Sequence, residues 1–408
     1  MSDGTVIVGA SHAGVQCAAS LRDMGYDGAV TLIGDDPAPP YHRPPLSKGF
    51  MAGTMSAEGL VLRSDAFFRE AAIRFRPGTC VARIDRDARR VVLADGSALS
   101  YDHLVLATGT RPRRWPGDGL PADAHMLRTM DDACRLRAHL ARTDAPVVVI
   151  GGGYVGLELA ATLCSSRSIT VVEGASRLLM RGASPALAGL IARRHMAAGT
   201  HVLTDVTVMG FVPDGPGRTR VVLSNGRSLP AGPVIVGIGV VPNQELAAAA
   251  GLPCADGVLV DATCRTEDAS IFAIGDCARF PMPRLGGTMR LECVQNAHDQ
   301  ARIAAAAIAG RPGLYDAVPW FWSDQLGSKF QTAGIVPTDG LCITRGDPEG
   351  GKGAFFHYVG DALRAVETID APALHMQARR LIGTGINPSH NQASDAGFDL
   401  RSLQSRAT

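Results

Sequence analysis

The sequence predicts an α/β fold in which two βαβ units are followed by a small α+β domain. In each unit an apolar, β-branched run leads into a glycine-rich loop and then a helix-like stretch, and the two loops begin about 140 residues apart. After Trp320 the pattern changes to two alternating runs on either side of Gly360-Asp361, a strong signal for a two-residue hairpin turn.

The totals describe a globular protein of two or three domains. The chain has 408 residues, and single cores rarely grow past about 300 residues. Its 40 basic and 39 acidic residues indicate neither nucleic acid nor an anionic membrane as a partner. No apolar run reaches the roughly 18 to 20 residues of a membrane span. A strand pattern beginning by residue 5 leaves no room for a targeting peptide, so we expect a cytoplasmic protein.

The nine cysteines are scattered along the chain. No two of them have the CxxC spacing of zinc knuckles, cysteine-ligated iron–sulfur clusters or thioredoxin-type dithiols. We therefore expect no metal site, and reduced, buried thiols. The cysteines are Cys17, Cys80, Cys134, Cys164, Cys254, Cys264, Cys277, Cys293 and Cys342.

The first βαβ unit is predicted from its apolar runs. It consists of a strand over Thr5–Val8, a helix over Ala13–Met24 and a strand over Ala29–Ile33. The stretch Asp35–Lys48 must be irregular, because its five prolines forbid both a helix and a central strand. Further strands are expected over Thr79–Ile84, Arg90–Leu93 and His103–Ala107.

The second βαβ unit begins near Pro146 and continues through a strand over Ile169–Glu173. In the C-terminal part, Asp370 could cap a helix over Ala373–Ile382. The other predicted elements are strands over Val202–Val208, Arg220–Leu223, Val234–Ile238 and Ile271–Ile274, a helix over Asn296–Ile308, and hairpin strands over Phe355–Val359 and Ala362–Glu367.

This order of elements predicts an inserted domain. If Thr266–Asp276 returns to the first unit, the second unit lies within the first along the chain. The predicted domains are residues 1–113 with 244–319, the insert 114–243, and a C-terminal domain 320–408.

The second loop meets the complete G-x-G-x-x-G pattern of a dinucleotide site through Gly151, Gly153 and Gly156. Tyr154 and Val155 lie between the last two glycines. Glycines let the backbone turn sharply and approach the phosphates, while the helix N-terminus offers free N–H donors. The pattern therefore predicts a bound dinucleotide.

The acid that follows this loop indicates which dinucleotide is bound. Glu173 comes 20 residues after Gly153, where a carboxylate accepts hydrogen bonds from a ribose 2′-OH and repels a 2′-phosphate. NADH is therefore favoured over NADPH, although Arg177 could soften that preference.

The first loop keeps Gly9 and Gly14 but has Ser11 where the middle glycine belongs. Serine is small enough to permit close approach of a phosphate, so we expect the site to be intact. Either Asp35 or Asp36, just past the following strand, would bind the adenosine ribose. The sequence leaves these two alternatives open.

A third motif runs from Thr266 to Asp276 and delivers Gly275-Asp276 to a turn that can meet the ribityl chain of a flavin. The turn Ala107-Thr108-Gly109 is expected to line the same site. Two dinucleotide sites in one chain predict a flavin and a nicotinamide held face to face, as in an electron-transfer enzyme.

The order of these motifs resembles the two-dinucleotide flavoprotein superfamily, which includes the disulfide reductases and has a glutathione-reductase-like fold of two Rossmann-like domains. The segment Tyr41-His42-Arg43-Pro44-Pro45-Leu46-Ser47-Lys48 narrows the resemblance. It is similar to the NADH-dependent ferredoxin reductases coupled to oxygenases, of the putidaredoxin, rhodocoxin and biphenyl-dioxygenase type. Residues 35–55 contain no cysteine, which excludes the dithiol chemistry of disulfide reductases.

The resemblance implies FAD and NADH as cofactors and assigns contacts to both. It places Trp322 near the flavin and nicotinamide rings and makes Glu292 a weaker candidate for a nicotinamide contact. On the NAD side it adds Gly237 and Gly239. The other implied FAD contacts are Ala13, Asp35, Arg43, Lys48, Val81, Arg128, Asp276 and Val294.

The resemblance also implies that Lys48 and Glu158 form a catalytic pair beside flavin N5. A lysine there stabilises the anionic reduced flavin, while the glutamate orients the lysine and can hold the nicotinamide carboxamide.

The implied activity is hydride transfer from NADH to FAD, followed by release of single electrons to a 2Fe–2S ferredoxin that serves a cytochrome P450 or a dioxygenase. Such ferredoxins are acidic, so Arg63 and Arg302 are expected to steer docking. Arg111, Arg113 and Arg114 are the alternatives, and the protein could be a monomer or a homodimer.

Two rival functions stay open. The electron acceptor could be rubredoxin or a quinone. The chain could instead be a redox-sensing protein like apoptosis-inducing factor, although the near-zero net charge argues against that function.

Overall fold

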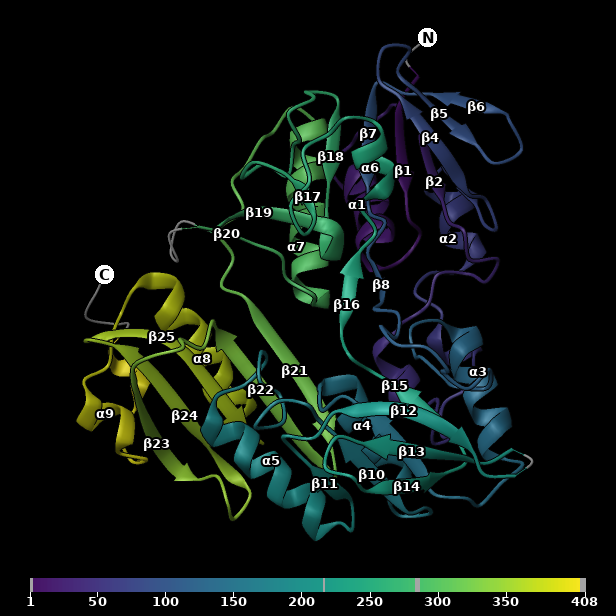
Figure 1. Ribbon diagram of the computed structural model, residues 1–408. Coiled ribbons are helices and arrows are strands. Elements are labelled where there is room, and N and C mark those ends of the chain that lie inside the picture. The colour runs from purple at the N-terminus through teal and green to yellow at the C-terminus, as the bar shows by residue number, and fades with distance from the viewer. Residues whose placement is uncertain (1–2, 216, 283–286, 404–408) are drawn as a thin grey trace. The chain divides into compact units, whose positions relative to one another are not determined.

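The computed structural model describes residues 3–215, 217–282 and 287–403 (Figure 1). The chain divides into two compact units, each assembled from three segments. The first unit comprises Met1–His42, Ala57–Arg111 and Val240–Ala317, and the second comprises Arg43–Ser56, Pro112–Gly239 and Val318–Thr408. The predicted boundaries group residues 43–56 with the first nucleotide domain, whereas in the structure this segment packs within the second unit.

A parallel five-stranded sheet forms the centre of the first unit. Helices α1 (His12–Asp23) and α7 (Val294–Ile308) pack side by side, and small residues such as Ala18 and Ala301 at their contact are fully buried (Figure 1). The strands, in sheet order, are β18 (Ile271–Ala273), β7 (His103–Leu106), β1 (Thr5–Val8), β2 (Val30–Ile33) and β3 (Ile73–Arg76). Because β18 pairs with β7, the Thr266–Asp276 motif returns to the sheet whose strand β1 leads into the first glycine loop.

The remaining elements of the first unit are short. They are β4 (Val81–Asp85), β5 (Arg90–Leu93) and β6 (Ala98–Ser100) in an antiparallel meander, β8 (Thr110–Pro112) paired with β16 (Val240–Pro242), β17 (Val258–Leu259), β19 (Ala278–Met282) and β20 (Gly287–Met289) in a small sheet, η2 (Glu58–Leu60), α2 (Asp65–Glu70), α6 (Glu245–Ala249) and η3 (Gly275–Cys277).

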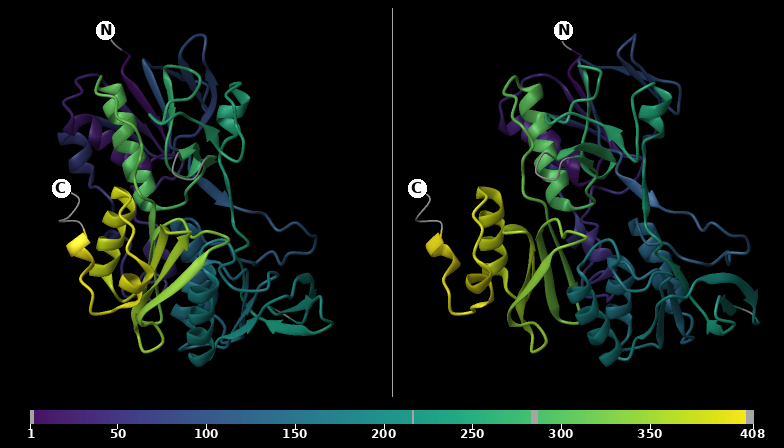
Figure 2. Two further views of the ribbon diagram at one scale, coloured as in Figure 1. Left: turned by 90° about the vertical axis from the view of Figure 1, so that its left-hand side faces the viewer. Right: turned by 60° about the vertical axis from the view of Figure 1, so that its left-hand side comes forward.

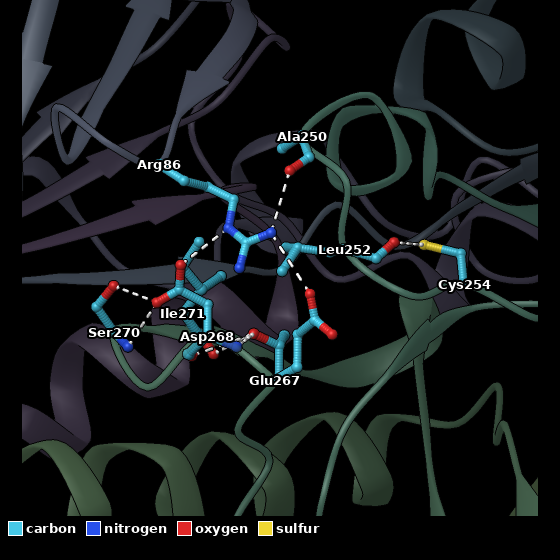
Figure 3. A network of polar contacts seen from close by, with 9 residues as sticks. Arg86, Ala250, Leu252, Cys254, Glu267, Asp268, Ser270 and Ile271 are labelled. Atoms are coloured by element: carbon cyan, nitrogen blue, oxygen red, sulfur yellow. Dashed lines mark hydrogen bonds and ion pairs between the residues drawn. The ribbon is translucent and has the colours of Figure 1, made fainter.

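Arg86 ties the meander to the loop that enters β18 (Figure 3). Its guanidinium donates to Asp268 Oδ2 at 3.0 Å and to the carbonyl oxygen of Ala250 at 3.4 Å, and it lies 3.4 Å from Glu267 Oε1. Asp268 in turn accepts the backbone and hydroxyl hydrogens of Ser270. This network fixes the start of β18, the strand that leads to Gly275 and Asp276.

The second unit begins with a parallel four-stranded sheet. Its strands, in order, are β11 (His201–Leu203), β10 (Ile169–Val172), β9 (Val147–Ile150) and β15 (Val234–Val236). The other elements of this part are η1 (Pro44–Ser47), α3 (Met130–Leu140), α4 (Tyr154–Leu163), α5 (Pro185–Ala197) and the antiparallel strands β12 (Val208–Pro213), β13 (Thr219–Leu223) and β14 (Ser228–Ala231).

An antiparallel sheet follows in the same unit, with α8 (Pro372–Thr384) packed on it (Figure 2). Phe356, Val366 and Leu381 form part of its fully buried core. Its strands, in order, are β21 (Trp320–Gln325), β22 (Ser328–Gly334), β25 (Ala362–Ile369), β24 (Lys352–Val359) and β23 (Leu341–Asp347). The chain then forms α9 (His390–Ser394) and η5 (Leu400–Leu403).

Two local predictions are wrong. The single strand expected over Val202–Val208 is two strands, β11 and β12, because Asp205 adopts a left-handed conformation with φ +57°. Asp370 does not cap α8: the N-cap is Ala371, and the Asp370 carboxylate accepts the backbone N–H of Lys329 at 2.7 Å.

Candidate functional site

The loop between β9 and α4 needs glycine at its two ends for reasons within the protein. Gly151 has φ +105°, and a Cβ there would lie 2.4 Å from the carbonyl oxygen of Gly237. A Cβ on Gly156 would lie 2.6 Å from the carbonyl oxygen of Gly151. Both contacts exclude a side chain, so the strand, the loop and the helix pack together closely.

Gly153, the N-cap of α4, is different. A Cβ at this position would meet no described atom within 4 Å, so the protein itself does not require glycine. The first turn of α4 also carries no acidic residue. The helix N-terminus is thus open to a close-approaching anion, which fits the pyrophosphate of a dinucleotide.

The neighbours of Gly153 are held in different ways. Tyr154 donates its hydroxyl to the carbonyl oxygen of Gly182 at 2.9 Å, and Val155 is exposed. Gly237 donates its N–H to Ile150 at the end of β9, whereas Gly239 accepts from the N–H of Arg113. Gly237 therefore lies against Gly151, at the edge where two parallel strands end.

Glu173 comes directly after β10 and fastens the second loop. Its Oε2 accepts the N–H of Gly152 at 2.7 Å, and its Oε1 accepts the N–H of Ala175 at 2.7 Å. An ionised carboxylate has about four acceptor positions, so two remain for ribose hydroxyls.

The Arg177 side chain is bound to backbone carbonyl oxygens and not to Glu173. Its guanidinium donates to the carbonyl oxygens of Leu178, Leu179 and Met180, at 3.2, 3.1 and 3.1 Å. In this conformation the Arg177 guanidinium does not neutralise the Glu173 carboxylate, so it would not favour a 2′-phosphate on the ribose.

In the first unit, three turns that are distant in sequence meet at the carboxyl ends of β1, β7 and β18. Gly9 has φ +115°, and a Cβ there would lie 2.1 Å from the carbonyl oxygen of Ala107. A Cβ on Gly14 would lie 1.9 Å from the Gly9 carbonyl oxygen. A Cβ on Gly275, which has φ +74°, would lie 3.0 Å from the methyl group of Ala13. The first loop therefore has the same construction as the second.

The other predicted residues around these turns have defined positions. Ser11 is the N-cap of α1, in the place that Gly153 takes before α4. Thr108 exchanges hydrogen bonds with Asn243, and Gly109 adopts φ +65°. Asp276 accepts from the Thr110 hydroxyl at 3.4 Å.

Three further residues of the predicted FAD set lie on separate elements. Val294 is the first residue of α7, and Val81 begins β4 and packs against the apolar cluster around the meander. Glu292 is exposed and forms an ion pair with Arg290 at 2.7 Å.

The two acids after β2 differ in their contacts. Asp36 accepts from the N–H of Ala38 and from the hydroxyl of Tyr41, both at 2.9 Å, and so organises the proline-rich segment. Asp35 is exposed and has no hydrogen-bond partner among the described residues. Only Asp35 keeps both carboxylate oxygens available.

Lys48 and Glu158 form an ion pair within the second unit, with Nζ 2.7 Å from Oε2. Lys48 also donates to the carbonyl oxygen of Pro44 at 3.2 Å. The Glu158 carboxylate accepts from the hydroxyls of Ser47 and Ser323, each at 2.6 Å. Sequence reasoning did not single out either serine, although each is adjacent to a predicted residue.

Two more predicted contacts lie in the second unit. Arg43 donates to the carbonyl oxygen of Arg128 at 3.1 Å, which ties the segment before η1 to the start of α3. Trp322 lies on β21, with its ring 5.6 Å from that of Trp320.

A group of basic side chains lies in the first unit around His42 and His298. Burial, and then the charge of Arg63, lower the pKa of His42. Burial and then Arg302 lower the pKa of His298, which also feels Arg63. The two predicted docking arginines are therefore close enough to act on one imidazole.

The alternative arginines are placed differently. Arg111 forms an ion pair with Glu245 at 2.6 Å and donates to Asn243 at 2.9 Å. Arg113 and Arg114 are exposed in the second unit.

In the parts of the chain that are described, no helix combines the length and apolarity needed to cross a membrane. Within the same ranges, no group of three or more His, Cys, Asp or Glu residues is arranged to hold a metal ion.

Residues 4–301 match the family described as pyridine nucleotide-disulphide oxidoreductase, and residues 320–404 match the reductase C-terminal family. The chain is 43% identical to rhodocoxin reductase of Rhodococcus erythropolis, over 97% of this chain and 93% of the relative. It is 38% identical to putidaredoxin reductase of Pseudomonas putida, over 98% and 97%.

Solved structures agree with these relatives. A ferredoxin reductase for the CYP199A2 system of Rhodopseudomonas palustris has a TM-score of 0.95 and 40% identity, over 98% of this chain and 99% of that one. The covalent putidaredoxin reductase–putidaredoxin complex has a TM-score of 0.95 and 38% identity, over 99% of both chains.

Proposed function

The chain belongs to the pyridine nucleotide-disulphide oxidoreductase family, and from this premise we propose that it is an FAD-dependent reductase that passes electrons from NADH to a 2Fe–2S ferredoxin. The ferredoxin in turn supplies a cytochrome P450 or a ring dioxygenase. The observation that carries the proposal is the pair of similarly built glycine loops, each of which leads from a parallel strand into a helix N-terminus, where a pyrophosphate binds.

We assign the FAD side to the first unit. The loop from Gly9 through Ser11 to Gly14 would hold the pyrophosphate at the start of α1, and Asp35 would bind the adenosine ribose because Asp36 already holds the proline-rich segment. Asp276 accepts from the ribityl hydroxyls. The remaining proposed FAD contacts of the first unit are Ala13, Val81, Ala107, Thr108, Gly109, Gly275, Glu292 and Val294. Four proposed FAD contacts belong to the second unit: Arg43, Lys48, Arg128 and Trp322.

The NAD side is assigned to the second unit. Gly151, Gly153 and Gly156 admit the pyrophosphate, and Glu173 accepts from the ribose hydroxyls. NADH is preferred to NADPH because a 2′-phosphate would meet the Glu173 carboxylate. The remaining proposed NAD contacts are Tyr154, Val155, Glu158, Gly237 and Gly239.

FAD, when bound, supplies the conversion between a two-electron donor and a one-electron acceptor. The chain supplies charge and orientation. Lys48 presents an ammonium group whose position is fixed by Glu158 and by the carbonyl oxygen of Pro44. A cation fixed in advance stabilises negative charge that develops beside it without reorganising during the reaction. We therefore propose Lys48 and Glu158 as the catalytic pair.

Docking of an acidic ferredoxin is assigned to Arg63 and Arg302. Both act on the His298 imidazole, so their charges reinforce each other over one part of the first unit. Arg111 pairs with Glu245, as Arg302 pairs with Asp299 at 3.0 Å, but no second arginine is seen to act on the same group as Arg111 among the described residues. The predicted domain boundaries, a cytoplasmic location and the choice between monomer and homodimer stay predictions.

The proposal is tested by anaerobic reduction of the purified flavoprotein with NADH and NADPH, followed by mixing with a panel of 2Fe–2S ferredoxins, a rubredoxin and a quinone. We expect rapid reduction by NADH and rapid reoxidation by at least one 2Fe–2S protein. Preferential turnover of rubredoxin or quinone would overturn the acceptor assignment. A reduced flavin that persists in air would favour the redox-sensing alternative.

A further inference from the structure

A chain of buried side chains extends from Glu158 into the C-terminal sheet and back to α5. The Ser323 hydroxyl lies 2.6 Å from Glu158 Oε1, and Gln325 Nε2 lies 3.0 Å from Ser323 Oγ. His195 Nε2 lies 2.8 Å from Gln325 Oε1. We call these four residues the Ser323 chain. None of the proposed catalytic or cofactor contacts uses Ser323, Gln325 or His195.

The chemistry of the four groups fixes the direction of every hydrogen bond. An ionised carboxylate only accepts, so Ser323 must donate its hydroxyl hydrogen to Glu158. The Ser323 oxygen then accepts from the amide nitrogen of Gln325, which turns the amide oxygen of Gln325 toward His195. His195 must therefore carry its hydrogen on Nε2. Each hydrogen bond thus has a single direction, and the other ring nitrogen of His195, Nδ1, is buried without a hydrogen-bond partner among the described residues.

Burial makes the Ser323 chain costly to break. Ser323 and His195 are fully buried, and Gln325 and Glu158 are exposed by only 3% and 6%. Burial lowers the pKa of His195, which keeps its ring neutral and preserves the single tautomer. A buried acceptor that loses its donor keeps its desolvation cost without a compensating hydrogen bond, and this cost is larger when the acceptor is charged.

Side chains along β21 point alternately to its two faces, and this places Ser323 and Gln325 on the same face. Phe321, Ser323 and Gln325 alternate with the two tryptophans, and the Phe321 ring lies 4.4 Å from that of Tyr154 at the start of α4. Because strand side chains point alternately to opposite faces, the face with Ser323 meets the helix that carries Glu158.

We propose that Ser323, supported by Gln325 and His195, is a positioning residue that holds the Glu158 carboxylate in the orientation that keeps Oε2 on Lys48. The two carboxylate oxygens have separate partners: Oε1 accepts from Ser323, and Oε2 faces Ser47 and Lys48. Without Ser323 the carboxylate can rotate, so the C-terminal sheet sets the geometry of the catalytic pair. This inference rests on the proposed function.

The test compares Ser323→Ala, Ser323→Cys and Gln325→Leu in the FAD-loaded enzyme. Anaerobic rapid mixing with NADH separates the limiting rate of flavin reduction from the NADH dissociation constant. For Ser323→Ala we expect a limiting rate lower by about 10-fold, with the dissociation constant changed by less than about 2-fold. Ser323→Cys retains a weak donor and should recover part of the rate, and Gln325→Leu should show a smaller loss.

Ser328→Ala is the matched control. Ser328 accepts from Arg194 at 2.6 Å, so its removal also breaks a bond between α5 and the β21–β22 hairpin without touching the Ser323 chain. We expect it to keep the wild-type limiting rate. An equal loss in Ser328→Ala would mean that Ser323 acts only through packing, and would overturn the inference.

A crystal structure of Ser323→Ala provides a readout that does not depend on turnover. We expect Glu158 to be rotated, with its carboxylate more than about 4 Å from Lys48 Nζ, the outer limit of an ion pair. A slower rate without rotation, or rotation without a slower rate, overturns the inference. If Ser323→Ala fails to fold, Ser323→Cys and Gln325→Leu are judged by the same two measurements. Failure of the wild type to accept hydride from NADH would instead refute the proposed function.

Discussion

At the scale of single residues, Lys48 and Glu158 form an ion pair in which the carboxylate is buried. Removing one partner of a buried ion pair costs about 3 to 5 kcal/mol, but Lys48 keeps a fifth of its side chain exposed, and Ser47 and Ser323 still donate to the carboxylate.

We therefore expect Lys48→Met to lower the free energy of unfolding by about 2 kcal/mol, measured by urea denaturation. In a double-mutant cycle, Glu158→Gln should remove most of that loss, because no charge is then left buried alone. Strictly additive effects would contradict a coupled pair.

Glu173 is expected to set the preference for NADH. This preference can be tested by mutation, because the Arg177 guanidinium is bound to backbone carbonyl oxygens. Glu173→Gln keeps one acceptor oxygen and removes the charge, so kcat/KM for NADH should fall by about 10-fold and the preference over NADPH should narrow. Steady-state kinetics with both nucleotides measure the two effects.

Arg177→Ala is the control for this prediction. The guanidinium is occupied by three carbonyl oxygens, so the ratio of NADH to NADPH activity should change by less than about 2-fold. A marked loss of NADPH activity in this variant would show that Arg177 does reach the ribose.

At the scale of elements, the N-terminus of α5 is fastened to the C-terminal sheet through a buried pair. Glu367 on β25 accepts the N–H of Ser184, the N-cap of α5, at 2.8 Å, and also accepts its hydroxyl. His357 on β24 donates to the same carboxylate at 2.9 Å. Burial would lower the pKa of His357, but hydrogen bonds with Cys342 and Glu367 outweigh it and raise the pKa to about 9.

This pair predicts a defined dependence of stability on pH. The pKa of His357 is higher in the folded than in the unfolded chain, so its contribution is complete below about 6.5 and is lost as pH rises through about 9. The free energy of unfolding of the wild type should therefore fall over this range, as measured by urea denaturation at fixed pH values. In His357→Gln the fall should be smaller, and an identical fall would contradict the assignment.

The elements also define what sequence patterns can and cannot predict. The runs over 5–8 and 90–93 form strands with the predicted ends, because a short run of apolar, β-branched residues is a local property of the sequence. The break at Asp205 was not predictable, because no glycine marks its left-handed φ and its N–H bonds to the carbonyl oxygen of Ala175, which is distant in sequence. In the same way, aspartate is a residue type that often caps a helix, but the Asp370 carboxylate accepts the backbone N–H of Lys329 on β22.

At the scale of the whole molecule, the net charge is only +1, so it cannot steer an acidic partner by itself. Attraction must come from a local group, and the side chains around His298 provide one: Arg63, Arg302 and His42, with Asp299 opposing them.

Arg302→Ala should raise the KM for an acidic 2Fe–2S ferredoxin by about 3- to 10-fold at low ionic strength. The difference should shrink above about 0.15 M salt, because screening removes the same attraction. Arg311→Ala, which removes an exposed arginine just beyond the end of α7, should leave the KM unchanged. Equal effects of the two variants would argue against a specific docking role.

The same group predicts a dependence on pH. The pKa values of His42 and His298 are lowered from 6.5, so both rings gain charge only below that pH. The KM for the ferredoxin should therefore fall as pH decreases below about 6.5. The double variant His42→Gln with His298→Gln should abolish that fall, and persistence of the effect would assign it to the ferredoxin.

The sequence by itself determined the two glycine loops, the acid at position 173, the order of the motifs and the family. These features can be predicted because the backbone conformation of a left-handed turn, a strand end or a helix start depends on residues that are adjacent in sequence. The tertiary structure decided which of Asp35 and Asp36 is engaged, where Arg177 points, and that Ser47 and Ser323 hold Glu158. The two serines are 111 and 165 residues from Glu158 along the chain, so only folding brings their hydroxyls to its carboxylate.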